Sequence, residues 1–129
     1  MQEAVILVLE DNDQARFVIR ALLEQQGYTV VEATNEAEAI AICERAEQPI
    51  HLLISDVILS NARGTDVARR ITSLRPELPI VFVSGYSPED LEDRGWLGSE
   101  QFSDRRMVFL QKPFAPAVLL DSVKTLVAG

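Results

Sequence analysis

The sequence has only one cysteine, Cys43, among its 129 residues. A single cysteine cannot form a disulfide bond within the chain, and this usage fits a reducing compartment such as the cytoplasm. Cys43 follows Ile40 and Ala41 in a segment of helical character, so we expect it to belong to the core and assign it no chemistry. The sequence therefore predicts a cytoplasmic protein whose fold does not depend on disulfide bonds.

Long hydrophobic runs are also lacking. The longest purely apolar runs, such as residues 4–9, are only as long as a strand, whereas a membrane helix needs about 20 apolar residues. Gln2 and Glu3 do not suit the basic start of a signal peptide. We therefore expect no membrane segment in this chain.

Positive charge is scarce. Twelve lysines and arginines face twenty aspartates and glutamates, which gives a formal net charge of −8. Such a charge opposes the phosphate backbone of nucleic acids, and the basic pairs at 69–70 and 105–106 are isolated rather than gathered into a basic patch. We therefore expect no direct nucleic-acid partner.

The chain contains neither internal repeats nor low-complexity segments. Its length is ordinary for one domain with a sizeable core. We therefore predict a single domain over residues 1–129.

Five short apolar segments alternate with five segments of helical character. A continuous apolar run of this length is typical of a strand that is buried on both faces of a parallel sheet. The alternation predicts an α/β fold, a doubly wound five-stranded parallel sheet with helices on both faces. The common small solution is the flavodoxin-like strand order 2-1-3-4-5. The predicted strands cover residues 4–9, 28–33, 50–56, 79–83 and 107–110.

Apolar spacing and capping signals predict the five helices. The first ends at Gly27, the third stops before Pro76, and a short fourth helix runs between Ser87 and Gly95. Asn35 and Glu38 suggest a capping box for the second helix, which extends to about residue 46. The expected inner faces are Ala15, Val18, Ile19 and Leu22 in the first helix, Val67, Ala68, Ile71 and Leu74 in the third, and Leu119, Ser122, Val123 and Leu126 in the last.

Acidic residues follow the first and third predicted strands, which the expected order makes neighbours. Glu10 and Asp11 would then lie beside Asp56. Two like charges about 4 Å apart repel by roughly 1 to 4 kcal/mol, depending on the effective dielectric. Few compensating charges are evident, so we expect a divalent cation there, and all-oxygen ligands favour Mg²⁺.

Ser84 and Lys112 follow the fourth and fifth predicted strands. A lysine ammonium and a serine hydroxyl at this edge could both contact a phosphoryl group, which leaves Asp56 as the nucleophile. Taken singly, each residue has a simpler explanation, such as a turn, a helix cap or a surface lysine. Their joint occurrence at four strand ends favours phosphoryl chemistry.

These residues lie in motifs that resemble response-regulator receiver domains. The resemblance implies that Asp56 is the phosphoacceptor, that Ser84 is the switch hydroxyl and that Lys112 contacts the phosphoryl group. It also implies that Glu10, Asp11, Asp56 and the carbonyl of Ile58 organise Mg²⁺. The motifs are Val8-Leu9-Glu10-Asp11-Asn12, Ile54-Ser55-Asp56-Val57, Gly64, Val83-Ser84-Gly85-Tyr86 and Phe109-Leu110-Gln111-Lys112-Pro113-Phe114.

The resemblance implies further details. Phe109 occupies the position of the switch aromatic, and the Lys112–Pro113 bond is expected to be cis. The runs at 84–87 and 109–114 are similar to receivers fused to bacterial hybrid sensor histidine kinases. Two features depart from the family pattern: Glu10 stands where aspartate is commoner, and residues 59–63 lack the usual proline.

The implied function is a phosphorelay switch. The implied phosphate donor is a histidine kinase or a histidine-containing phosphotransfer domain, and the output partner is not identified. The chain would be no enzyme beyond promoting its own phosphorylation and dephosphorylation. Because the bulky residues Ile58 and Tyr86 lie two positions after Asp56 and Ser84, we expect slow hydrolysis of the phosphoryl group.

Two other classes of function compete with this one. A phosphorylation-independent interaction module could keep the fold, although the intact set of Asp11, Asp56, Ser84 and Lys112 argues against it. An enzyme on the same architecture is less well supported. Related aspartyl-phosphate hydrolases need a second acid where this chain has Ile58, and a flavin binder needs a phosphate-cradling loop after the first strand.

Overall fold

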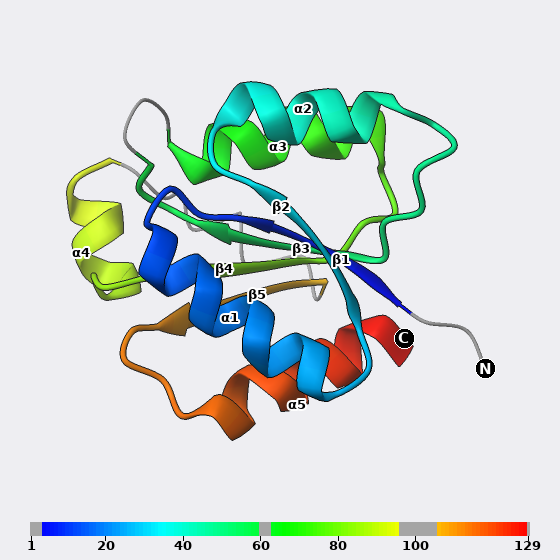
Figure 1. Ribbon diagram of the computed structural model, residues 1–129. Helices are drawn as coiled ribbons and strands as arrows, with labels where there is room; N and C mark the ends of the chain where they lie inside the picture. The colour runs from blue at the N-terminus through cyan, green and yellow to red at the C-terminus, as the bar shows by residue number, and fades with distance from the viewer. Residues whose placement is uncertain (1–3, 60–62, 96–105, 129) are drawn as a thin grey trace.

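The strands of the computed structural model form one parallel sheet (Figure 1). The structure describes residues 4–59, 63–95 and 106–128. Its strand order is β2-β1-β3-β4-β5, which confirms the predicted doubly wound fold. The strands are β1 (Val5–Leu9), β2 (Thr29–Ala33), β3 (Leu52–Asp56), β4 (Ile80–Ser84) and β5 (Met107–Gln111).

Helices cover both faces of the sheet. Helices α1 and α5 lie on one face, α2 and α3 lie on the other, and α4 lies beyond the carboxyl end of β4 (Figure 1). In the described part of the chain, no helix is both long enough and apolar enough to cross a membrane. The helices are α1 (Asp13–Gln25), α2 (Glu36–Glu44), α3 (Gly64–Leu74), α4 (Pro88–Asp93) and α5 (Pro116–Ala128).

The core has two halves, one on each side of the sheet. Successive strand residues point to opposite faces, so Leu7 and Leu9 of β1 pack toward α2 and α3 while Ile6 and Val8 pack toward α1 and α5. Cys43 is buried in the first half, as expected. Because helices cover both faces, the central strands are buried at every position and mostly apolar, instead of alternating.

The predicted cap of α2 forms with one change. The Asn35 side chain accepts a hydrogen bond from the backbone N–H of Glu38 at 2.9 Å, as a capping box requires. The Glu38 carboxylate, however, accepts from the backbone N–H and the hydroxyl of Thr34 instead of the N–H of Asn35. These two hydrogen bonds lower the pKa of Glu38, because they favour its charged form.

The caps of α4 agree with the sequence. The Ser87 hydroxyl accepts from the N–H of Asp90 at 3.1 Å, and Pro88 is the first helical residue. Gly95 follows the helix with a φ of 74°, a conformation that favours glycine. Of the basic pair at 105–106, the structure describes only Arg106.

Two of the predicted inner faces need correction. Val18 in α1 is 54% exposed, and Leu23 is buried in its place. Helix α1 turns Arg16 and Arg20 toward Glu32 on the edge strand β2, and Ile19 and Leu23 are its buried residues. Leu74, the last residue of α3, is 44% exposed and borders an open cavity instead of the core.

Candidate functional site

Four polar residues lie at the carboxyl end of the sheet, where open α/β folds place their ligands. Glu10 directly follows β1, and Lys112 directly follows β5. Asp56 and Ser84 are the last residues of β3 and β4. The register pairs Asp56 with Val83 and Ser84 with Gln111, which places these four ends on one edge.

The Asp56 carboxylate is buried and held from two sides. One oxygen, Oδ1, accepts a hydrogen bond from the backbone N–H of Ile58 at 2.9 Å. The other, Oδ2, lies 3.0 Å from the ammonium of Lys112. Asp56 is 8% exposed, so one orientation of its carboxylate is well defined by these two donors.

Glu10 contacts the same lysine. Its Oε1 lies 3.0 Å from Lys112 Nζ, and its Oε2 accepts from the N–H of Asn12 at 3.0 Å. Lys112 thus bridges Glu10 and Asp56, although 102 residues separate it from Glu10 in the sequence. The Lys112 ammonium is thus a compensating charge between two of these acids, and it balances only part of their negative charge.

Burial and charge shift the ionisation of this cluster. Burial, together with the nearby charge of Asp56, raises the pKa of Glu10 despite its hydrogen bonds to Asn12 and Lys112. Burial disfavours the ammonium of Lys112, but Asp56 and Glu10 outweigh it and raise the pKa of Lys112. Lys112 is therefore a fixed positive charge at neutral pH.

The raised pKa of Glu10 makes a prediction about stability. When the pKa of a carboxyl group is higher in the folded state, its contribution to the free energy of unfolding is largest at a pH below the ordinary pKa of 4.5. This contribution is lost as the pH rises through the raised pKa. Because glutamine does not titrate, the stability of Glu10→Gln relative to wild type should increase as the pH is raised from acidic to neutral. Urea unfolding with a chelator present measures this difference, and a difference that stays constant or falls would contradict it.

Ser84 connects the last two strand ends. Its carbonyl accepts from the backbone N–H of Lys112 at 2.7 Å, and its Oγ accepts from the N–H of Tyr86 at 3.1 Å. A hydroxyl that accepts in this way still has a hydrogen to donate. The Lys112–Pro113 bond that follows is cis, the isomer that the resemblance implies.

Gly64 brings the start of α3 against the backbone of Asp56. The N–H of Gly64 donates to the carbonyl of Val57 at 2.6 Å. A Cβ atom at position 64 would lie 1.9 Å from the Asp56 carbonyl oxygen, a distance that real contacts do not reach. Only glycine therefore allows this close approach.

The donor set has the chemistry of a hard-cation site. Glu10 and Asp56 carry two negative charges against the one positive charge of Lys112, and Asp11 adds another negative charge next in the chain. Carboxylate and carbonyl oxygens are the ligands that Mg²⁺ prefers. Among the described residues, no three acidic, histidine or cysteine side chains lie close enough together to form a metal site. In this conformation Asp11 is therefore not close enough to Glu10 and Asp56 to form one with them.

The remaining predicted residues surround this edge. Ile58 is half-buried and packs against the core on the α2 and α3 side. Its backbone forms an isolated antiparallel β-bridge with that of Arg63. Tyr86 is 39% exposed, and its ring lies 4.7 Å from the Arg94 guanidinium carbon. Phe109 is half-buried against the same core as Ile58.

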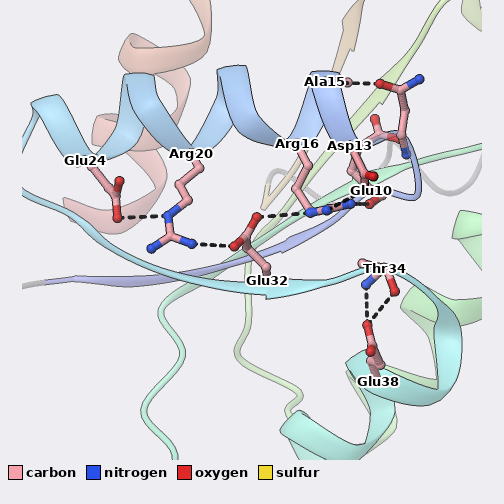
Figure 2. Close-up of polar contacts among 10 residues, drawn as sticks. Glu10, Asp13, Ala15, Arg16, Arg20, Glu24, Glu32, Thr34 and Glu38 are labelled. Atoms are coloured by element: carbon pink, nitrogen blue, oxygen red, sulfur yellow. Dashed lines mark hydrogen bonds and ion pairs between the residues drawn. The ribbon is translucent and has the colours of Figure 1, made fainter.

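Sequence reasoning missed the role of Arg16, which was not among the residues of the expected inner face of α1. Figure 2 shows its guanidinium pointing toward β2 and the loop that carries Glu10. Its side chain is only 14% exposed. A glutamate inside an edge strand, Glu32, preceded by arginines four residues apart on a helix, is the signal that could have identified this contact.

Comparison with known proteins agrees with this geometry. The chain matches the family described as response regulator receiver domain over residues 6–124. Sensor kinase CckA of Brucella abortus (strain 2308) is 33% identical over 121 residues, which are 94% of this chain and 12% of that protein. The response regulator receiver protein CpdR of the same strain is 32% identical over 126 residues, which are 97% of this chain and 98% of that protein.

Solved structures give the same result. The crystal structure of the receiver domain from hybrid histidine kinase CckA has a TM-score of 0.77 and 31% identity, over 96% of this chain and 99% of that one. A CheY-like receiver domain protein from Methanospirillum hungatei JF-1 has a TM-score of 0.83 and 25% identity, over 98% and 95%. Receiver domains are in general regulatory modules instead of enzymes. With a family match over most of its length, this chain belongs to the response regulator receiver domains of two-component systems.

Proposed function

We propose that Asp56 accepts a phosphoryl group from a phosphohistidine on a histidine kinase or a histidine-containing phosphotransfer domain. One observation carries this proposal: the buried Asp56 carboxylate ends β3 with the Lys112 ammonium 3.0 Å from its Oδ2. Phosphoryl transfer needs chiefly in-line positioning and neutralisation of charge on the phosphoryl oxygens. Lys112 supplies a positive charge at the place where those oxygens would form.

Mg²⁺ fits the same edge. The carboxylates of Glu10, Asp11 and Asp56 and the carbonyl of Ile58 would hold it, and it would neutralise negative charge on a phosphoryl group. A phosphoryl group on Asp56 would compete with Glu10 for the Lys112 ammonium. Lys112 would then leave its present bridging position and follow the new charge.

Ser84 and Phe109 are the residues that we propose to report phosphorylation. Ser84 is the last residue of β4, the strand beside β3, and its hydroxyl can donate to a phosphoryl oxygen on Asp56. The Ser84 hydroxyl also accepts from Tyr86 N–H, and Tyr86 lies in the short segment between β4 and α4. A shift of this hydroxyl would therefore change the conformation of the segment that leads into α4. Phe109 on β5 would repack as the space near Ser84 changes.

Intact-mass measurement with a small phosphodonor tests the proposal. The chain should gain one phosphoryl group when Mg²⁺ is present and none when a chelator removes it, because the acidic edge otherwise repels the donor. Peptide mapping should place the group on Asp56. A chain that stays unmodified with Mg²⁺, under conditions that phosphorylate a control receiver, would refute the proposed function.

Hydrolysis of this group should be slow. Tyr86 lies two residues after Ser84 beside the site, and Ile58 donates its N–H to Asp56, so both could limit the approach of water. Tyr86→Ala and Ile58→Asn should each shorten the lifetime of the phosphorylated chain severalfold. Decay followed by mass spectrometry measures this, and unchanged lifetimes in both variants would remove shielding as the explanation.

The relatives suggest two settings for the chain. It is similar to a segment that is 12% of a sensor kinase and to nearly all of a response regulator receiver protein. We favour the setting of a hybrid sensor kinase, in keeping with the motifs at 84–87 and 109–114, and place the chain in the cytoplasm without direct contact to nucleic acid. Phosphotransfer from purified candidate kinases would identify the cognate donor, and transfer from a stand-alone kinase in preference to a hybrid kinase's own relay would count against the hybrid setting.

A further inference from the structure

The loop that carries Glu10 and Asp11 is held by an arginine that the proposed reaction does not use. The Nη1 of Arg16 donates to the backbone carbonyl of Glu10 at 2.9 Å. Its Nε donates to Glu32 Oε1 at 3.0 Å, and its Nη2 donates to Asp13 Oδ1 at 2.7 Å (Figure 2). One guanidinium thus connects helix α1, strand β2 and the β1–α1 loop.

The three contacts of Arg16 differ in how strongly they hold the loop. The Asp13 side chain is 86% exposed, so solvent screens that ion pair and it contributes little. The Glu32 side chain is 30% exposed and that of Arg16 only 14%, so the pair between them is better shielded. The contact with Glu10 is made to a backbone carbonyl, which fixes the position of the loop itself.

The backbone of Glu10 is therefore held on both sides. Its N–H donates to the carbonyl of Ala33 on β2 at 3.1 Å, and its carbonyl accepts from Arg16. Both anchors belong to or lead to the edge strand β2, since Glu32 precedes Ala33. The carboxylate of Glu10 and the neighbouring Asp11 project from the segment that these anchors define.

We propose that Arg16 is a positioning residue for the cation site of the proposed phosphorylation reaction. By holding the Glu10 carbonyl against β2, it would keep the segment that carries Glu10 and Asp11 close to Asp56, so that only a small movement gathers the three carboxylates around Mg²⁺. Residues that orient metal ligands without touching the metal commonly change metal affinity by roughly 10- to 100-fold when replaced. This inference rests on the proposed function in one respect, because that function is the reason for expecting the cation to be Mg²⁺.

Arg16→Lys is the main test, and Arg20→Lys is its matched control. Lysine keeps the charge but lacks the planar fork that reaches two acceptors at once. Arg20 lies one turn further along α1 and pairs with the same Glu32 and with Glu24, but it does not contact Glu10 (Figure 2). Both variants lose an arginine contact to Glu32, so only an effect specific to the Glu10 loop should separate them.

Mg²⁺ titration, followed by the backbone amide resonances of Asp11 and Asn12, gives a readout that does not depend on phosphorylation. We expect Arg16→Lys to raise the Mg²⁺ dissociation constant roughly tenfold and Arg20→Lys to leave it within about twofold, while urea unfolding shows similar stabilities. Should Arg16→Lys be poorly folded, Arg16→Gln replaces it. Equal Mg²⁺ affinities in the Arg16 and Arg20 variants would overturn the proposal.

The same samples separate this inference from the proposed function. If wild type binds Mg²⁺ but accepts no phosphoryl group, the proposed function fails, and the affinity difference still decides the role of Arg16. If wild type is phosphorylated and the two arginine variants behave alike, the function stands and Arg16 is only a structural ion-pair partner. Phosphorylation of Arg16→Lys should recover when Mg²⁺ is raised to saturation, which a general loss of structure would not allow.

Discussion

Asp56→Asn should abolish phosphorylation of the chain while leaving it folded. Only a carboxylate oxygen can attack the phosphoryl group and form an aspartyl phosphate. The asparagine carbonyl oxygen can still accept the hydrogen bond from Ile58 N–H that Oδ1 accepts now. The variant therefore removes the nucleophile with little change of shape.

The charge balance of the site also changes in this variant. Its amide N–H₂ would face the Lys112 ammonium, where Oδ2 now accepts, so Lys112 should move toward Glu10. Because the charge of Asp56 helps to raise the pKa of Glu10, that pKa should move closer to its ordinary value. Carboxyl titration by nuclear magnetic resonance measures this shift.

Asp66→Asn is the matched control for the loss of phosphorylation. The Asp66 side chain is 56% exposed on α3 and pairs only loosely with Arg69 at 3.3 Å. It should take up a phosphoryl group as wild type does. Labelling of Asp56→Asn at Glu10 or Asp11 would move the nucleophile to the β1–α1 loop, whereas unchanged labelling at position 56 is chemically excluded by the amide.

The fold could be predicted because its signals are local. Each buried strand contains a short apolar run, and glycine, proline or a capping side chain separates it from the next helix. Asn35 and Ser87 lie at the N-caps that their positions predict. Strand ends could therefore be placed within one or two residues, the alternation predicted a parallel sheet, and the order matched the common small arrangement.

The rotation of α1 could not be predicted in the same way. Val18 is as apolar as its neighbours, so hydrophobic spacing alone places it inside. The helix instead follows the contacts of Arg16 and Arg20 with Glu32 on β2, which depend on where a later strand lies. Burial of Leu23 offsets the exposure of Val18, because full burial of either side chain contributes roughly 1.5 to 3 kcal/mol, so both rotations bury similar apolar area.

In the candidate site, too, the positions of the residues could be predicted, whereas their side-chain pairing could not. Strand ends predicted that Glu10, Asp56, Ser84 and Lys112 share one edge, and the structure places them there. Their pairing was not predictable, because a lysine side chain is long and flexible and its partner depends on the local charges. The bridge from Lys112 to both acids follows from burial, where an unpaired carboxylate would be costly.

Gly64→Ala should destabilise the fold strongly. Its Cβ would lie 1.9 Å from the Asp56 carbonyl oxygen and 2.9 Å from both the Asp56 carbonyl carbon and the Val57 Cα. All three atoms belong to the backbone of the β3 end, so no side-chain rotation relieves the overlap. Overpacking commonly costs about 1 to 3 kcal/mol, and we expect at least the upper end of that range in the free energy of unfolding.

Gly85→Ala is the control for this substitution. Gly85 follows β4 at the same edge of the sheet, has no atom within 4 Å of an added Cβ, and does not have a positive φ. Alanine at such a position is neutral or stabilises by up to about 1 kcal/mol, because it restricts the unfolded chain. The two substitutions should therefore change the urea midpoint in opposite directions, or only Gly64→Ala should change it.

The same steric argument links stability to function. To admit a Cβ, the start of α3 or the end of β3 must move, and Asp56 moves with the latter. Phosphorylation of folded Gly64→Ala should then be slower than that of wild type at saturating Mg²⁺, and the N–H of Ile58 should lose its hydrogen bond to Asp56 Oδ1. Amide exchange at Ile58 measures that loss. An alanine variant with wild-type stability and wild-type exchange would mean that α3 can withdraw from Asp56 at no cost, and that the close approach of Gly64 does not position the phosphoacceptor.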